Sequence, residues 1–184
     1  MKFVPQSIAG VILIKPMVHG DGRGYFIETF RRDLFDKAVG YTVNFIQDSE
    51  SKSAKGVLRG LHYQLPPYSQ NKLVRVIEGS VLDIAVDIRK SSSTFGQHVA
   101  AELTENNKHQ LFIPQGFAHG FVVLSDTATL AYKVDNYYAQ DHDRGIAFDD
   151  EQLAIDWRLP KDELQLTDKD KNHPNLSDAS DYFE

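Results

Sequence analysis

The segment KLVRVIEGSVLDIAVDIR (residues 72–89) decides the fold class of this chain. Its even positions are mostly apolar, from Val74 to Ile88, whereas its charged residues fall mainly on odd positions. A repeat of two residues is typical of a β-strand, whose successive side chains point to opposite faces. Residues 78–80, Glu-Gly-Ser, interrupt the repeat and predict a hairpin turn between two strands.

Shorter apolar segments of the same kind lie on both sides of this stretch. Glycine- and proline-rich sequences separate them, for example HGDGRG at residues 19–24, which we interpret as a turn. Many short strands at a spacing of about ten residues, with few helices, favour a β-sandwich or a small barrel. A double-sheet jelly roll of the cupin type is one such fold, and it leaves a cavity between its sheets. The predicted strands are 8–18, 43–47, 109–113, 119–124 and 128–134.

Only two helices are predicted, and both are short. Residues 31–40 place apolar side chains such as Leu34 and Val39 at helical spacing, and Gly40 stands where a C-cap belongs. Asp149, followed by a glutamine three residues later, predicts a short capped helix. The polar residues 49–56 are expected to form a loop. The chain from residue 161 onward is expected to be coil, with a tail at 171–184.

The composition restricts the classes of function that are open to this chain. Its 184 residues suit one domain (1–184), and 41% hydrophobic and 25% charged residues are ordinary values for a globular protein. The chain has no cysteine, which excludes disulfides, cysteine nucleophiles and iron–sulfur clusters. A net charge of −6 argues against nucleic-acid binding. Because no apolar run suits a membrane helix and no signal peptide is recognisable, we predict a cytoplasmic protein.

The common catalytic motifs are missing from this sequence. It contains no P-loop, no dinucleotide-binding GxGxxG, no GxSxG elbow and no HExxH. The candidates that remain are polar residues set in apolar strands or near the C-terminus. They occur in RGLHYQ (59–64), KLVRV (72–76), PQGFAHGF (114–121), YKVDNYY (132–138) and TDKD (167–170).

Four of these polar residues each admit a structural and a functional interpretation. His62 is either a structural strand residue or a base, and a base needs a carboxylate partner that sets its tautomer. Lys72 is either a surface lysine or, if buried, a cation that stabilises an oxyanion. Tyr132 is either a core residue or a site residue, and Asp170 is either a solvated charge or part of a site. None of the four is specific on its own.

A cupin metal site is tested directly by the histidine spacing. Metal-binding cupins use a His-x-His pair, a glutamate and a later histidine, but the corresponding stretch here is His62-Tyr63-Gln64. The sequence from Pro114 to His119 matches only the later half of that pattern. Because imidazole-based sites generally need at least three ligands, we predict no catalytic metal.

Taken together and in order, these segments resemble the dTDP-4-dehydrorhamnose 3,5-epimerase family of nucleotide-sugar epimerases. The resemblance implies a cupin-type fold and a dTDP-linked 4-keto-6-deoxy sugar as substrate. It implies that dTDP-4-dehydro-6-deoxy-D-glucose is converted to dTDP-4-dehydro-L-rhamnose by inversion at C3 and C5, within dTDP-L-rhamnose biosynthesis and without a cofactor. The similar stretches are 20–30, 44–64, 71–97, 110–126, 132–138 and 166–170.

The resemblance also implies a role for each candidate catalytic residue. His62 matches the base and Asp170 the carboxylate that orients it. Lys72 matches the group that stabilises the enolate, and Tyr132 matches the proton donor. A single-site epimerase or a ketoisomerase on the same scaffold, a metal-dependent cupin dioxygenase and a non-catalytic sugar-binding cupin are the competing interpretations.

Further positions match the family's substrate-binding residues. Guanidinium and ammonium groups among them suit a diphosphate, so a local cluster of cations can bind an anionic ligand despite the negative net charge. The family resemblance also implies a homodimer in which N-terminal segments (about 1–48) are exchanged between the subunits. The predicted binding residues are Arg23, Phe26, Glu28, Gln47, Ser49, Arg59, His119, Tyr138, Asp143 and Lys169.

Two further observations concern the predicted site residues. Departures from the family's usual residues occur at Ser49, Gln140, Asp143 and Phe148, near nucleotide or wall positions. In addition, strict alternation would send two predicted site residues of the segment 59–64, the arginine and the histidine, to opposite faces of their strand. For both to line one cavity, the glycine after the arginine must allow a bulge or twist.

Overall fold

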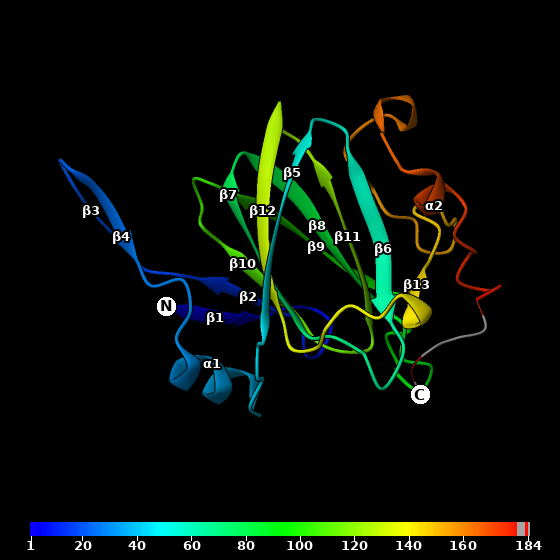
Figure 1. Ribbon diagram of the computed structural model, residues 1–184, viewed down its shortest axis with the longest axis horizontal. Coiled ribbons are helices and arrows are strands. Elements are labelled where there is room, and N and C mark those ends of the chain that lie inside the picture. The colour runs from blue at the N-terminus through cyan, green and yellow to red at the C-terminus, as the bar shows by residue number, and fades with distance from the viewer. Residues whose placement is uncertain (180–182, 184) are drawn as a thin grey trace.

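The structure is a computed structural model that describes residues 1–179 and 183 (Figure 1). Its strands pair in antiparallel fashion, and two sheets account for most of the molecule. In the described part of the chain, one sheet has the strand order β1 (Lys2–Pro5), β2 (Ile12–Lys15), β10 (Gln110–Ile113), β7 (Lys72–Glu78), β12 (Thr127–Val134), β5 (Gln47–Ala54). The second has the order β13 (Asp143–Gly145), β6 (Leu58–Gln64), β11 (Phe117–Val123), β8 (Ser80–Asp87), β9 (His98–Thr104).

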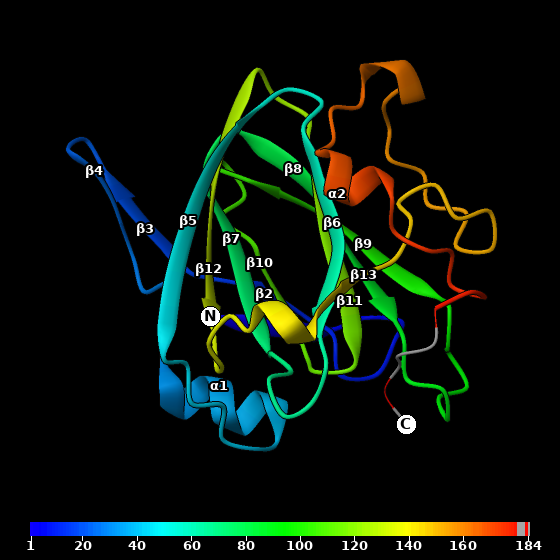
Figure 2. The ribbon, with the colours of Figure 1, turned by 45° about the vertical axis from the view of Figure 1, so that its right-hand side comes forward.

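The two sheets pack face to face, which confirms the predicted jelly roll of the cupin type (Figure 2). Their facing sides share one apolar cluster, to which β7 contributes Val74 and Val76 and β12 contributes Leu130. A second cluster covers the outer side of the five-stranded sheet, and a third lies between the six-stranded sheet and helix α1 (Arg32–Val39). Burial of apolar surface on both sides of the sheets therefore stabilises the fold.

Strand β8 shows why residues 72–89 alternate with exceptions. Its even residues, such as Leu82 and Ile84, belong to the outer cluster, whereas Val81 and Ala85 belong to the cluster between the sheets. Both sides are buried, so apolar residues on odd positions do not break the two-residue repeat.

The predicted hairpin between β7 and β8 is wrong, although both strands exist. β7 pairs with β10 and β12, and β8 pairs with β9 and β11, so the two strands belong to different sheets. Gly79 forms the corner with a φ of +79°, and a Cβ there would lie 2.1 Å from the Thr127 carbonyl oxygen. The backbone therefore turns from one sheet into the other at the only type of residue that fits.

The predicted loop at 49–56 is also wrong, because β5 continues through residue 54 and pairs with β12 over its whole length. Ser51 of this strand lines a cavity, and Ser53 accepts hydrogen bonds from Arg59. Polar side chains thus occupy the face that an apolar strand would turn to the core. The hydrophobic pattern of a strand is absent for this reason.

The helix predicted at 31–40 is confirmed as α1, and Gly40 caps it in the left-handed conformation with a φ of +89°. The strand predicted at 43–47 is wrong, since only residue 47 lies in a strand. Val43 and Phe45 instead pack around Phe35 of α1. Their apolar character holds the helix against the sheet.

The N-terminal prediction of one strand at 8–18 is replaced by shorter pieces. β2 covers only the middle of the range 8–18. The interpretation of 19–24 as a turn holds only for the centre of that stretch. Residues 18–27 form an arm, a two-stranded ribbon of β3 (Val18–Asp21) and β4 (Gly24–Ile27). The arm extends away from the sheets at the left of Figure 1.

The C-terminal region is more ordered than its polar sequence predicts. The capped helix expected at residue 149 is wrong: Asp150, not Asp149, accepts hydrogen bonds from two following backbone amides, and the segment forms turns. Helix α2 (Asp168–Lys171) and the single-turn segment η2 (Lys161–Glu163) break the coil expected from residue 161, and a further single turn, η1 (Gln140–His142), precedes β13. Leu176, in the predicted tail, is buried in the outer cluster. Over the described residues, no helix is both long and apolar enough to cross a membrane.

The bulge expected in β6 is present at Gly60. Against β11, His62 pairs with His119 but Arg59 pairs with Phe121, so β6 contains one extra residue between the two pairs. The φ of Gly60 is +133°, and a Cβ there would lie 2.5 Å from Gly120 Cα. The extra residue turns the side chains on both sides of the bulge toward the same cavity.

We expect Gly60→Ala to lower the free energy of unfolding by about 2–4 kcal/mol, because it combines an unfavourable φ with a backbone clash. Gly22→Ala is the matched control, since no atom lies within 4 Å of a Cβ at that position. Urea denaturation of both variants measures the difference. Equal stability of the two variants would show that the bulge does not require glycine.

Candidate active site

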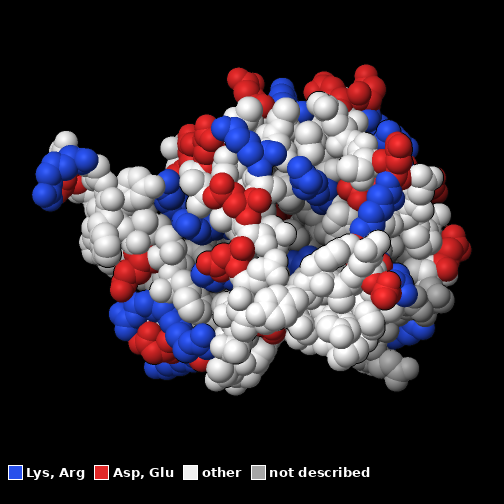
Figure 3. Space-filling view, viewed as in Figure 1, with Lys and Arg blue, Asp and Glu red and all other residues white. Residues whose placement is uncertain are grey.

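A cavity of about 310 Å³ opens between the two sheets and contains all four predicted catalytic residues. His62, Lys72, Tyr132 and Asp170 line it. Figure 3 shows this face of the molecule hollowed between the sheets, with Lys and Arg atoms around the hollow. Residues that are distant in sequence therefore meet at one place.

The sheets place the imidazole and the phenol on opposite walls of this cavity. His62 lies on β6 of the five-stranded sheet, whereas Tyr132 lies on β12 of the six-stranded sheet. Lys72 lies on β7, next to β12, with its Cα opposite Val134. Lys72 and Tyr132 share the parity of the core residues Val74 and Leu130 on their strands, so both point between the sheets.

Asp170 reaches the cavity from α2, which packs beside β6 in Figure 2. The Thr167 hydroxyl accepts a hydrogen bond from the Asp170 backbone amide at 3.2 Å and caps the helix. The Asp170 carboxylate is buried, and its Oδ1 lies 2.7 Å from His62 Nε2. Because a carboxylate accepts, His62 donates from Nε2, and Nδ1 is left to accept a proton.

Burial and hydrogen bonding set the protonation states of this pair. Burial lowers the pKa of His62 from its ordinary value, although the bond to Asp170 opposes this effect. Burial alone would raise the pKa of Asp170, but interactions with His173 and His62 hold that pKa far below its usual range. The pair is therefore a neutral imidazole beside a carboxylate at neutral pH, the combination that general-base catalysis requires.

Lys72 is a half-buried cation on the wall opposite His62. Burial lowers the pKa of Lys72 to about 8, and the negative charges of Asp143 and Asp83 oppose that change. A partly desolvated ammonium interacts strongly with an anion that forms beside it, because little water screens the charge.

Two of the predicted binding residues complete the inner part of the cavity. His119 Nε2 lies 3.0 Å from an oxygen of the fully buried Asp83, and the two residues belong to paired strands. Arg59 bonds Ser53 Oγ through two guanidinium nitrogens, at 3.2 Å each. Both side chains line the cavity and are held in place by neighbours.

A neighbouring hollow of about 290 Å³ extends the cavity toward β13. It shares three predicted catalytic residues with the main cavity, namely His62, Lys72 and Tyr132. It adds Gln47, Tyr138 and Asp143. The Tyr138 hydroxyl donates to Asp143 Oδ2 at 3.0 Å, and Lys169 forms an ion pair with the same oxygen. Lys169 lines both hollows, so it links them.

The remaining predicted binding residues lie elsewhere. Ser49 borders a different hollow, and its hydroxyl accepts a hydrogen bond from Gln47 at 3.0 Å. Arg23 and Phe26 lie on the exposed arm, and Glu28 lies directly after it. Within one chain, the structure does not bring these three residues to the cavity.

One group of side chains has donor atoms close enough to consider a metal. Ligand atoms of His62, Asp170 and His173 all lie within 4.8 Å of one another. A metal ion would have to replace the existing bond between His62 and Asp170, so we assign no metal to this group. That the catalytic site uses no metal stays a prediction.

Three residues that shape the site were missed in the sequence. Asp83, the partner of His119, appeared only as a charged odd position of its strand. Thr167 and Asp170 form a Ser/Thr-x-x-Asp/Glu capping pattern that could have revealed α2. His173 carries no local signal, because it is a histidine in a polar segment.

The profile of the protein family described as dTDP-4-dehydrorhamnose 3,5-epimerase matches residues 5–178. The chain belongs to the dTDP-4-dehydrorhamnose 3,5-epimerase family. It is 52% identical to the dTDP-4-dehydrorhamnose 3,5-epimerase of Shigella flexneri, over 100% of this chain and 99% of that protein.

Solved structures of epimerases agree with this membership. One is the dTDP-6-deoxy-D-glucose-3,5-epimerase of Legionella pneumophila in complex with dTDP-4-keto-L-rhamnose, at 45% identity and a TM-score of 0.93, over 97% of this chain and 94% of that one. Another is a 3'-monoepimerase of Streptomyces bikiniensis in complex with dTDP-quinovose, at 33% identity and a TM-score of 0.88, over 95% and 87%. The same fold therefore supports epimerisation at one or two carbons.

Proposed function

We propose that this chain epimerises dTDP-4-dehydro-6-deoxy-D-glucose at C3 and C5 to give dTDP-4-dehydro-L-rhamnose. The observation that carries the proposal is the arrangement of the cavity: an imidazole and a phenol line it from opposite sheets, and a half-buried ammonium lines the same space. Acid–base chemistry on both faces of a sugar ring needs this arrangement.

Proton removal begins at His62. The hydrogens on C3 and C5 are acidic because the C4 ketone delocalises the charge of the resulting carbanion as an enolate. With Nε2 bonded to Asp170, Nδ1 of His62 takes the proton. The carboxylate then faces an imidazolium and stabilises its charge.

The negative charge of the enolate forms on the C4 oxygen. Lys72 supplies a half-buried positive charge for this oxygen, and a preorganised donor of this kind contributes about 10²–10³-fold to the rate. The cation costs little reorganisation because burial already restricts its environment.

Inversion requires that the proton return from the other face. Tyr132 on the opposite wall donates its phenolic proton to the enolate carbon, and the configuration at that carbon changes. His62 then loses its proton and Tyr132 regains one through solvent before the second carbon reacts. No electrons leave the substrate, so we predict that no redox cofactor takes part.

The anionic half of the substrate matches the cations of the cavity. Arg59 and Lys169 line the same space as the catalytic groups and suit the diphosphate. The neighbouring hollow with Gln47 and Tyr138 extends from this point, and we place the nucleoside there.

The pH dependence of kcat/KM is expected to be bell-shaped. His62 acts when neutral, so activity falls as pH decreases through its pKa, which burial has lowered. Lys72 acts when protonated, so activity falls above its pKa of about 8. Initial rates between pH 5 and pH 10 measure both limbs, and a profile that stays level up to about pH 10 would contradict the role of Lys72.

We propose further that the arm completes the site of a second copy in a homodimer. Arg23, Phe26 and Glu28 match substrate-binding positions of the family but lie far from the cavity of their own chain. Figure 3 shows basic atoms at the tip of the arm, and Tyr25 and Phe26 are 58% and 67% exposed. Large exposed apolar side chains on a projecting ribbon are typical of an interface.

Co-expression of two inactive variants tests this dimer. We expect Arg23→Glu and His62→Asn to be inactive alone, because one lacks the arm contact and the other lacks the base. In a mixed dimer, one of the two sites combines an intact base with an intact arm. Random pairing makes about half of the dimers mixed, so about a quarter of the wild-type activity returns. An inactive mixture in which mixed dimers form would refute the exchange, and monomers in light scattering would refute the dimer.

Product analysis tests the proposed function as a whole. The purified chain is incubated with dTDP-4-dehydro-6-deoxy-D-glucose, and NMR coupling constants give the configuration of the product. Inversion at both carbons supports the proposal, whereas inversion at one carbon or a migrated ketone identifies a monofunctional epimerase or a ketoisomerase. Iron-dependent oxidation would indicate a dioxygenase, and binding without turnover a sugar-binding cupin. The cytoplasmic location stays a prediction.

A further inference from the structure

We infer that His173 is a positioning residue for the base: it holds the Asp170 carboxylate in place and shares its negative charge with His62. This inference rests on the proposed role of His62 as the base. It adds a third member to the pair of imidazole and carboxylate that the family resemblance implies.

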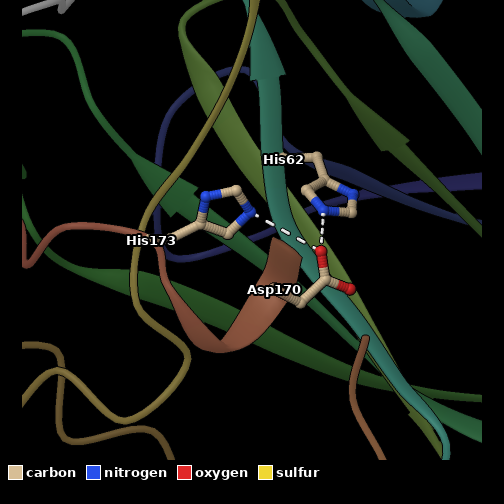
Figure 4. Close-up of side chains that lie close together, drawn as sticks. All are labelled: His62, Asp170 and His173. Atoms are coloured by element: carbon tan, nitrogen blue, oxygen red, sulfur yellow. Dashed lines mark hydrogen bonds and ion pairs between the residues drawn. The ribbon is translucent and has the colours of Figure 1, made fainter. Parts of the chain in front are cut away.

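The geometry joins the three side chains through one oxygen atom. His173 Nε2 lies 3.5 Å from Asp170 Oδ1, the same oxygen that lies 2.7 Å from His62 Nε2. Figure 4 shows both imidazoles directed at this carboxylate. The two rings also contact each other edge to face, with centroids 5.6 Å apart and an angle of 82°. A displacement of His173 would therefore disturb both members of the pair.

The burial of His173 makes this orientation informative. Its side chain is 10% exposed, and Nε2 is buried with no hydrogen-bond partner among the described residues, with the Asp170 carboxylate 3.5 Å away. An orphaned buried nitrogen costs free energy, so its placement beside the carboxylate calls for a compensating role. An electrostatic interaction with the charge of Asp170 supplies that role, since little water screens two groups that are both largely buried.

The surrounding backbone is built to seat this ring. Gly145 of β13 pairs with His62, and a Cβ on Gly145 would lie 2.3–2.5 Å from three ring atoms of His173. The segment after His173 is fixed by a hydrogen bond from the Ala147 amide to the Pro174 carbonyl at 2.8 Å. The missing side chain at Gly145 thus leaves the space that His173 fills.

The shared oxygen has an electrostatic consequence for His62. The imidazole nitrogen of His173, 3.5 Å from the shared oxygen, stabilises the negative charge of the carboxylate, so less of that charge remains to stabilise a protonated His62. Loss of His173 should therefore raise the pKa of His62 and move the acidic limb of kcat/KM to higher pH. The other titratable groups that line the two hollows around His62 stay in place in this comparison: Arg59, Tyr63, Lys72, His119, Tyr132, Tyr138, Asp143 and Lys169.

A matched pair of substitutions separates this role from simple packing. Glutamine in His173→Gln keeps a side-chain N–H. Methionine in His173→Met has nearly the same shape as glutamine but no donor. We expect the Met variant to lose about 10-fold in kcat with little change in KM, and its acidic limb to shift upward by about half a pH unit. The Gln variant should recover most of both losses.

Gly145→Ala gives a second test that leaves His173 itself intact. Its Cβ displaces the imidazole, so the variant should show the same upward shift of the acidic limb as His173→Met. Added to His173→Met, it should change the limb no further, because the displaced group is already gone. If His173→Met folds poorly, Gly145→Ala alone still tests the role of His173, because the two substitutions remove the same contact in different ways.

The outcomes distinguish this inference from the proposed function. If both His173 variants lose thermal stability equally and keep the wild-type pH profile, His173 is only a packing residue and the inference is wrong. If the wild-type chain does not epimerise the substrate, the proposed function fails instead. In that case, the pKa of His62 from NMR titration still decides whether His173 influences it, and an unchanged value in His173→Met overturns the inference.

Discussion

Replacing His62 with Asn is expected to lower kcat by about 10³-fold or more, because the reaction loses the group that removes the proton. The amide of Asn can still bond to Asp170 but cannot accept a proton from carbon. Both product formation and exchange of the C3 and C5 hydrogens with solvent should stop. Initial rates measured by product analysis give the size of the effect.

His109→Asn is the matched control for this change. His109 directly precedes β10 and lines neither of the two hollows of the site. This variant should keep wild-type kcat and KM. If His62→Asn retains more than about a tenth of the wild-type kcat, another group acts as the base and the assignment is wrong.

Tyr132→Phe is expected to give a different defect from His62→Asn. Proton removal by His62 continues, but no donor remains on the opposite wall. His62 therefore exchanges its proton with solvent and returns one to the face from which the first was taken. Product formation should fall by about 10²–10³-fold. In deuterated water, however, recovered substrate should carry label with unchanged configuration.

Tyr41→Phe controls for the loss of a hydroxyl group. The Tyr41 hydroxyl donates to Asn71 Oδ1 at 3.2 Å, outside the cavity. This variant should keep wild-type activity. If Tyr132→Phe stops exchange as completely as His62→Asn does, the phenol takes part in proton removal, and the division of roles across the cavity is incorrect.

The general fold could be predicted because the two-residue repeat of a buried strand is a local property. The partner of a strand is not local, however. β7 and β8 follow each other through Gly79 but pair with strands that are distant in the sequence, as Lys72 of β7 pairs with Val134 of β12. Alternation alone does not distinguish a hairpin from a corner between two sheets.

The strand β5 escaped prediction because its inward face is polar, with Ser51 lining the cavity and Ser53 bonded to Arg59. A strand that faces a polar ligand does not need the apolar face by which strands are recognised. The misassignment thus marks a functional surface, as local rules often fail where a site is built. The bulge at Gly60 could be predicted only because two site residues had to share one face.

The grouping of the catalytic residues could not be derived from spacing. His62 and Asp170 are 108 positions apart, and nothing local connects them. The family resemblance supplied the pair, and the structure places it at hydrogen-bonding distance. His173 matched no motif in the sequence, so only its position beside Gly145 brought it to attention.

The most direct test of the account is the incorporation of solvent deuterium by the wild-type chain, measured by NMR of the nucleotide sugar in D₂O. The account predicts label at both C3 and C5 of an inverted product. It also predicts that Tyr132→Phe gives labelled substrate of unchanged configuration and that His62→Asn gives no label. Product without label at either carbon would contradict proton transfer by facing groups across the cavity.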